Sequence, residues 1–118
     1  MKNLFLSLFG FFLISCATQT PKGSIDKELV KDAIRSRAAN YRQCFYTENE
    51  KNKTLEGKVI IFWEINELGN AQNLSVVKST LNNSAVENCV VESLKTIQFP
   101  KPSKGIVSEV TYPFNFKK

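Results

Sequence analysis

An apolar segment at the amino terminus decides which part of this chain can fold as a domain. Met1-Lys2-Asn3 is a short basic start, and residues 4–14 are almost entirely apolar. The segment is shorter than the roughly 20 apolar residues that a membrane-spanning helix needs, and it has no polar face, as a core helix would have. This arrangement is typical of an export signal. We therefore expect residues 1–15 to be a signal peptide.

The residues around Cys16 predict how this signal ends. The segment Leu13-Ile14-Ser15-Cys16 resembles the lipobox of bacterial lipoproteins, with a branched apolar residue three positions before the cysteine and a small residue directly before it. The resemblance implies cleavage after Ser15 and lipidation of Cys16. Residues 16–23 would then be a lipidated tether and residues 24–118 the domain. In lipoproteins of this kind, Asp directly after the cysteine favours retention in the inner membrane. This chain has Ala17 there, so we expect the protein to be in the outer membrane and to face the periplasm. A plain signal peptide cleaved elsewhere is the alternative.

Composition limits the chemistry of the remaining chain. Without residues 1–15, the 118-residue sequence leaves 103 residues, enough for one domain. Basic residues are scattered and form no nucleic-acid-binding motif. Histidine is absent from the sequence, which removes the commonest general base and imidazole metal ligands. Glu64 and Glu67 are more typical of solvated strand-end charges than of a catalytic pair. We expect no catalytic or metal site, no cofactor, no small-molecule substrate and no nucleic-acid partner.

The cysteines predict a covalent link. The sequence has three; with Cys16 lipidated, Cys44 and Cys89 remain, and exported cysteines usually pair. A Cys44–Cys89 disulfide would close a loop of about 45 residues and contribute about 4 kcal/mol in the chain-entropy model. Two separately buried free cysteines are the alternative. The spacing is not the Cys-x-x-Cys of a redox pair.

Hydrophobic periodicity predicts two helices. Ser24 can cap the first, over about 25–44, and Ser84 with Glu87 forms a capping box for the second, over about 85–96. Residues 46–56 between the first helix and the next strand are expected to be a loop. The buried stripe of the first helix would be Val30, Ala33, Ile34, Arg37, Ala38, Tyr41, Cys44 and Phe45, and that of the second Val86, Cys89, Val90, Leu94 and Ile97.

Alternation of apolar residues predicts three strands. In the first, Val59, Ile61, Trp63 and Ile65 share one face. Trp63 is expected to pack in the core, with a ligand platform as the alternative. Gly69 supplies positive φ in the hairpin turn that follows, and a phase break in the second strand indicates a β-bulge near Asn73. In the final strand, over about 106–116, Pro113 lacks a donor, which favours an edge position.

These elements predict an α+β domain with the order α-β-β-α-β. A three-stranded antiparallel sheet with two helices packed on one face buries all the apolar stripes. If the last strand pairs beside the first, the strand order is 2-1-3 and the strand that carries Trp63 is central.

The order and several local motifs resemble the TonB C-terminal domain, and in detail its AgmX/PglI C-terminal branch. The matching pieces, which together cover residues 24–116, are Cys44-Phe45, Gly57-Lys58-Val59, Ile65-Asn66 with Gly69, Ser79-Thr80-Leu81, Val86-Glu87-Asn88-Cys89-Val90, Phe99-Pro100-Lys101-Pro102 and Tyr112-Pro113-Phe114-Asn115-Phe116. The resemblance implies a periplasmic protein-binding module and not an enzyme. Full energy transducers of this type add an uncleaved membrane helix and a long Pro-rich arm. In this sequence we expect a cleaved lipid signal and a tether of about seven residues in their place, so we do not carry energy transduction over to this chain.

The resemblance also implies where a partner binds. TonB-like domains add an extended peptide to a sheet edge, a mode that draws on backbone hydrogen bonds. The candidate edge here is the final strand, with Val107, Glu109 and Thr111. Alternatively, Pro113 and Lys117-Lys118 keep that edge unpaired.

We therefore expect a lipid-anchored envelope protein that binds or scaffolds other envelope proteins. A structural lipoprotein without a dedicated partner is the alternative, as is an accessory part of a TonB-like, motility or transport complex of the envelope. An enzyme is the remaining possibility from a different class.

Overall fold

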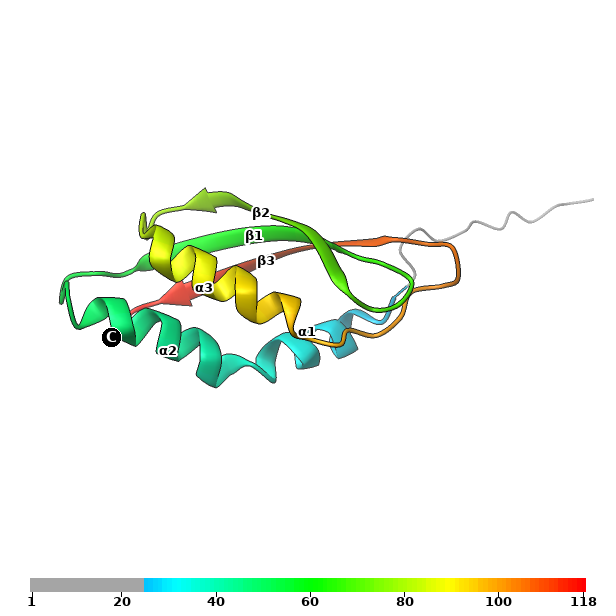
Figure 1. The fold of residues 1–118 in the computed structure, drawn as a ribbon, viewed down its shortest axis with the longest axis horizontal. Helices are drawn as coiled ribbons and strands as arrows, with labels where there is room; N and C mark the ends of the chain where they lie inside the picture. The colour runs from blue at the N-terminus through cyan, green and yellow to red at the C-terminus, as the bar shows by residue number, and fades with distance from the viewer. Residues whose placement is uncertain (1–24) are drawn as a thin grey trace, which may run out of the picture.

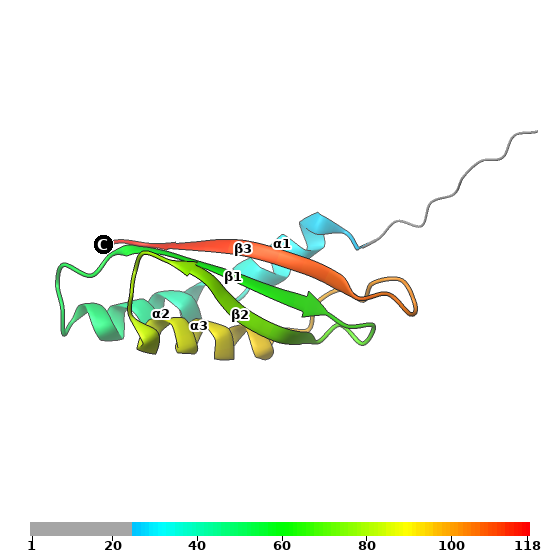
Figure 2. The same cartoon turned by 90° about the horizontal axis from the view of Figure 1, so that it is seen from above.

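Residues 25–118 are described in the computed structural model, and they form a three-stranded antiparallel sheet with helices on one side (Figures 1 and 2). The expected signal peptide, Cys16 and the tether lie outside these residues. The elements are α1 (Lys27–Arg35), α2 (Ala38–Asn49), β1 (Gly57–Ile65), β2 (Ala71–Ser79), α3 (Ser84–Lys95) and β3 (Ser108–Phe116). Within this part of the chain, no helix combines the length and apolarity that crossing a membrane requires.

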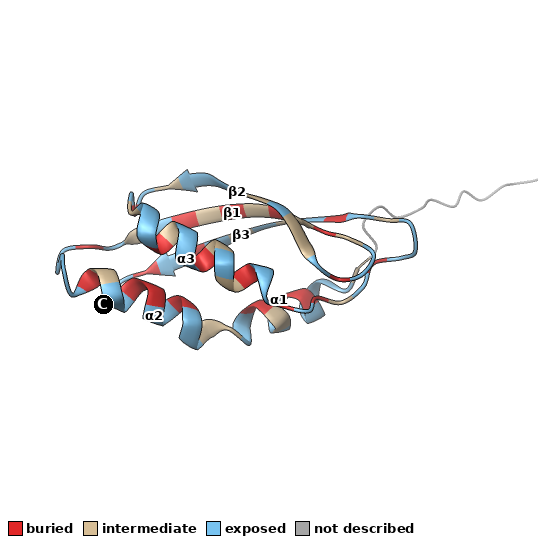
Figure 3. Ribbon diagram, in the orientation of Figure 1, coloured by how far each residue is buried: buried red, intermediate tan, exposed pale blue. Residues whose placement is uncertain are grey.

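The sheet has the predicted order, β2-β1-β3, with β1 in the centre. The core face of β1 is closed to solvent: Val59, Ile61, Trp63 and Ile65 are all 0% exposed. Figure 3 shows this alternation of buried and less buried positions along β1. Trp63 packs against Phe99, with ring centroids 5.8 Å apart, so its role in the core is confirmed.

The two neighbours of β1 pair with it differently. Every residue of β1 has a partner in β3, from Gly57 opposite Phe116 to Ile65 opposite Ser108, without a register shift. The pairing with β2 shifts twice, once between Ile60 and Ile61 and once between Phe62 and Glu64. The second shift contains Asn73, whose φ is 54°, and it confirms the β-bulge predicted there.

The first helical segment corrects a prediction. Instead of one helix over 25–44, α1 and α2 are separated at Ser36 and Arg37. The Ser36 hydroxyl donates to the Ala33 carbonyl (2.5 Å), and the Arg37 amide donates to the Ile34 carbonyl (3.1 Å), which tightens the last turn of α1. The Arg37 guanidinium then reaches the hydroxyl and carbonyl of Thr96, both at 3.2 Å. This charged member of the predicted stripe therefore fixes the junction to the end of α3.

The expected loop over 46–56 is shorter, because α2 continues to Asn49. Asn49 is 3% exposed and its amide donates to the Leu55 carbonyl at 3.4 Å. This bond closes the loop that follows the helix and explains why a polar residue is buried at the end of α2.

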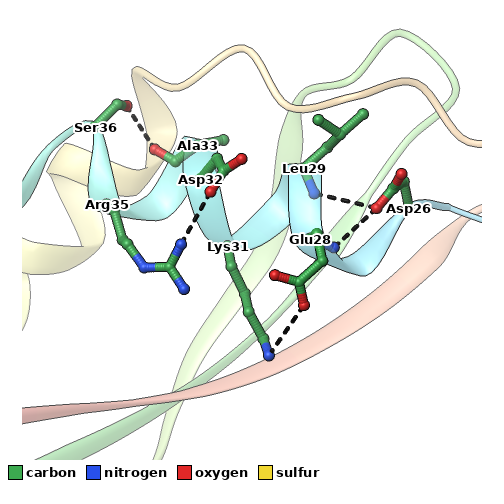
Figure 4. Close-up of polar contacts among 8 residues, drawn as sticks. All are labelled: Asp26, Glu28, Leu29, Lys31, Asp32, Ala33, Arg35 and Ser36. Carbon is green, nitrogen blue, oxygen red and sulfur yellow. Dashed lines mark hydrogen bonds and ion pairs between the residues drawn. The ribbon is translucent and has the colours of Figure 1, made fainter.

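Both helix caps differ from those predicted. Asp26 caps α1, where its Oδ1 accepts from the amides of Glu28 (2.9 Å) and Leu29 (3.2 Å) (Figure 4); Ser24 lies outside the described residues. Asn83, not Ser84, caps α3 through a bond from the Val86 amide at 2.9 Å.

The Glu87 of the predicted capping box has a different partner. Its carboxylate accepts from the Ser79 hydroxyl at 2.6 Å. Glu87 therefore joins α3 to the end of β2 instead of closing a capping box.

The predicted disulfide is present and links α2 to α3. Cys44 and Cys89 are bonded, with Cα atoms 5.7 Å apart. Cys44 is buried as expected, but Cys89 is exposed, because the buried stripe of α3 follows Val86, Val90 and Leu94. Cys89 lies beside this stripe and its sulfur reaches sideways to the neighbouring helix.

Loss of the disulfide should destabilise the domain. We expect reduction of the protein, or the Cys44→Ala/Cys89→Ala double substitution, to lower the free energy of unfolding by about 2–4 kcal/mol, since the bond restricts a long loop in the unfolded chain. Urea titration followed by circular dichroism measures this effect. Superimposable curves for oxidised and reduced protein would contradict the prediction.

The corrected cap of α3 can be tested with adjacent substitutions. Asn83→Ala should cost about 1 kcal/mol, because it leaves the Val86 amide without its acceptor. The matched control Ser84→Ala should be nearly neutral, since position 84 is inside the helix and Ala has the higher helix propensity. Thermal unfolding of both variants decides between the two caps: an equal or larger loss for Ser84→Ala would favour the capping box.

Candidate protein-binding edge

The direction of the outer backbone groups of β3 follows from contacts made by β1. The Lys58 amide donates to the Thr80 hydroxyl (2.9 Å), and the Lys58 carbonyl accepts from the Thr80 amide (2.8 Å). Both groups of Lys58 therefore point away from β3. Because backbone direction alternates along a strand, the residues of β1 that share this orientation are Lys58, Ile60, Phe62 and Glu64.

The partners of these residues in β3 must turn their own backbone groups outward. They are Asn115, Pro113, Thr111 and Glu109, in the same order. Pro113 therefore occupies a position where the ladder to β1 needs no donor, as an edge strand allows. Glu109 and Thr111 keep outward amides, and both side chains are exposed.

The three residues predicted to form the binding edge lie along one stretch of backbone, but only two of them belong to the strand. Glu109 and Thr111 lie in β3, whereas Val107 precedes it, because the strand begins at Ser108 and not at about 106. Val107 is 46% exposed. The edge available for pairing is therefore the segment from Glu109 to Thr111, with Asn115 beyond Pro113.

The opposite edge of the sheet is less suited to pairing. The two register shifts of β2 interrupt the regular spacing of its backbone groups, and bulges of this kind protect sheet edges. β3 has no such shift. The continuous edge of the sheet is therefore that of β3.

Two hollows lie between this edge and the helices. The ribbon shows α1 on the side of the sheet where β3 lies (Figures 1 and 2). The first, which we call the α1 groove, is lined by Lys27, Val30, Lys31, Ile34 and residues 109–112. The second, the Tyr41 groove, has a volume of about 320 Å³ and is lined by Ile34, Arg35, Ala38, Tyr41, Arg42 and residues 112–116. Ile34 and Tyr112 belong to both, so the two grooves adjoin along β3.

Tyr41 has an unusual environment in the second groove. Its ring packs edge-on against Phe114, with centroids 4.9 Å apart. It is 7% exposed, and its hydroxyl has no hydrogen-bond partner among the described residues. Burial raises the pKa of Tyr41 above its ordinary value, against the opposing charge of Arg37, so the phenol is neutral and retains its proton for donation. From the sequence, Tyr41 is predicted to belong to the buried stripe of the first helix. The one hint in the sequence that this position differs from an apolar core position is the residue type, because a buried Tyr carries a hydroxyl that usually has a hydrogen-bond partner.

The two carboxylates that could have formed a catalytic pair each have hydrogen-bond partners within the domain. Glu64 accepts from the side chains of Asn73 (2.6 Å) and Gln72 (3.2 Å), and Glu67 accepts from the Gly105 amide (2.8 Å). Glu64 therefore holds the bulge of β2, and Glu67 links the β1–β2 turn to the loop before β3. In residues 25–118, no group of three or more His, Cys, Asp or Glu side chains is arranged to hold a metal ion.

Comparison with solved structures identifies the fold. The chain resembles the solution structure of the Pseudomonas aeruginosa TonB C-terminal domain (TM-score 0.50, 22% identity, covering 62% of this chain and 76% of that one). Two solution structures of the Helicobacter pylori TonB C-terminal domain also match. One has a TM-score of 0.54 and 25% identity, covering 78% of this chain and 79% of that one. The other has 0.56 and 18%, covering 75% and 92%.

The described domain has the fold of a TonB C-terminal domain. The resemblance predicted from sequence is thus confirmed for the fold, including the strand order 2-1-3 of the TonB-like sheet. No protein-family model matches the sequence, and the search of curated proteins finds no match. The AgmX/PglI branch stays a prediction.

Proposed function

We propose that this chain is a non-catalytic envelope lipoprotein whose TonB-like domain binds an extended segment of another envelope protein. The observation that carries the proposal is the unbroken pairing of β1 with β3, which leaves the amides of Glu109 and Thr111 facing outward at an exposed edge. A partner segment that adds as a fourth strand would pair with these amides.

Pro113 defines the limit of this pairing. It removes one outward donor in the middle of the edge, and donors remain on either side, at Thr111 and at Asn115. A partner strand would therefore be held most firmly beside residues 109–111. Edge strands of soluble proteins are usually blunted against pairing, so the incomplete protection of β3 supports a binding role.

Anchoring and location rest on the sequence. The lipobox that ends at Cys16 supports lipidation, and Ala17 favours an outer-membrane protein that faces the periplasm. The Cys44–Cys89 disulfide fits an oxidising compartment. Residues 16–23 would tether the domain close to the membrane, since seven or eight residues span only about 25 Å when extended.

A structural lipoprotein without a dedicated partner is the second candidate. Pro113 and the basic Lys117-Lys118 at the end of β3 favour it, because both features discourage pairing at an edge. Membership of a TonB-like, motility or transport complex is a narrower form of the first proposal.

Proline substitutions should separate these candidates. Glu109→Pro or Thr111→Pro removes one outward amide without removing a bond to β1, so each should abolish recovery of the partner after crosslinking in intact cells and mass spectrometry. The fold should be unchanged by circular dichroism. The matched controls Glu109→Gln and Thr111→Val retain the amides and should keep the partner.

Two results would contradict strand addition. If both proline variants recover the same partner as the wild type, recognition lies elsewhere, first on the helical surface that carries Arg35 and Arg42. If the wild type repeatedly recovers no specific envelope protein, the structural role is favoured.

Lipidation is tested at the mature amino terminus. Mass spectrometry of the protein isolated from membranes should show a first residue, Cys16, that carries acyl chains, and Cys16→Ser should release the protein from the membrane fraction. An unmodified amino terminus at Ala17 or later would refute the anchor.

A further inference from the structure

The charges beside the β3 edge are unbalanced. The residues that line the Tyr41 groove include two cations, Arg35 and Arg42, and no carboxylate. Arg35 is paired with Asp32 at 2.9 Å (Figure 4). Arg42 is exposed and makes no ion pair within residues 25–118, so its guanidinium is available to an anion from outside the domain.

Tyr41, which lines the same groove, carries an unused hydrogen-bond donor behind the groove surface. The Tyr41 hydroxyl is shielded from solvent and has no partner in the described part of the chain. Burial of a polar group without a partner costs free energy that a suitable ligand can recover. A cation and a neutral hydroxyl donor beside apolar walls together match a carboxylate on a short methylene stem.

A strand added to β3 would direct side chains into this groove. The residues of β3 that face the helices include Val110, Tyr112 and Phe114, which belong to the core cluster or pack against it. Side chains of directly opposed residues in neighbouring strands lie on the same face of a sheet. The partner residue opposite Tyr112 or Phe114 therefore points toward α1 and α2, at the position of the Tyr41 groove.

We propose that the Tyr41 groove is a side-chain pocket for the partner strand and that it takes an aspartate or glutamate, whose carboxylate accepts from the Arg42 guanidinium and the Tyr41 hydroxyl. The pocket rests on the proposed strand addition and adds a sequence preference to it. Because the Tyr41 hydroxyl is shielded from solvent in the free domain, this contact requires a neighbouring side chain to shift on binding; the candidate is Tyr112, which is half-buried and lines both grooves.

The test uses fluorescein-labelled peptides of alternating Thr and Val, nine residues long like β3, with Glu, Gln or Leu at one inward position. Anisotropy is measured with the full mature chain in detergent micelles. The Glu peptide should bind about tenfold more tightly than the Gln peptide, because charge-assisted hydrogen bonds are stronger than neutral ones. Thr111→Pro should remove the binding of all three peptides.

Two variants test the proposed contacts. Tyr41→Phe and Arg42→Gln should each lower the Glu-to-Gln ratio to about two- to threefold, since each removes one of two donors to the carboxylate. Tyr41→Phe should leave the melting temperature unchanged or raised, because the lost hydroxyl has no partner in the free domain.

Matched controls lie outside the groove. Tyr46→Phe removes a hydroxyl from a tyrosine that is 47% exposed elsewhere on α2, and Lys53→Gln removes a positive charge from the loop after that helix. Both should keep the full Glu-to-Gln ratio, so that a general effect of charge or of the substitution is distinguished from an effect of the pocket.

The outcomes separate the two proposals. If all peptides bind in a manner that Thr111→Pro abolishes, but Glu has no advantage over Gln or Leu, the acidic pocket is overturned and strand addition stands. An unchanged Glu preference in both Tyr41→Phe and Arg42→Gln also overturns the pocket. If no peptide shows binding that depends on Thr111, strand addition is contradicted and the pocket falls with it.

Discussion

The burial of β1 is the constraint on which the rest of the domain depends. Four alternate residues of this strand are fully closed to solvent, and each such side chain contributes about 1.5–3 kcal/mol relative to an exposed one. A shift of β1 by one residue would turn this entire face away from the helices. The register of β1 is therefore fixed, and its unbroken pairing with β3 fixes in turn which backbone groups of β3 face outward.

The helices are held to each other by links that leave this edge untouched. The Cys44–Cys89 disulfide joins α2 to α3, and Arg37 joins the α1–α2 junction to Thr96 at the end of α3. Neither link involves β3. The domain thus combines a firmly braced helical layer with a continuous strand edge.

The sheet could be predicted from the sequence because its signals are local. Period-two alternation marked the core face around Trp63, the missing donor of Pro113 marked an edge, and the phase break near Asn73 marked a bulge that the structure confirms. The disulfide followed from counting cysteines in a chain with a predicted export signal. These features depend on neighbouring residues or on composition, which a single sequence records.

The errors arise where distant residues decide between local alternatives. The break between α1 and α2 involves Arg37 and Thr96, which are 59 positions apart, so helical periodicity alone could not show it. Asn83 and Ser84 are both good cap residues, and in the structure the extended backbone falls at Asn83 while Ser84 is already helical. The candidate pocket was missed for the same reason, since nothing in the sequence shows that the Tyr41 hydroxyl lacks a partner.

Amide hydrogen exchange of the unbound protein, resolved residue by residue by NMR, tests the central claim that β3 presents a free edge in fixed register. The outward amides of Glu109 and Thr111 should exchange rapidly, while those of Val110 and Tyr112, which face β1, should be strongly protected. Equal protection along the whole segment would show that the edge is already covered, and inverted protection would show that the register is wrong; either result would contradict the account.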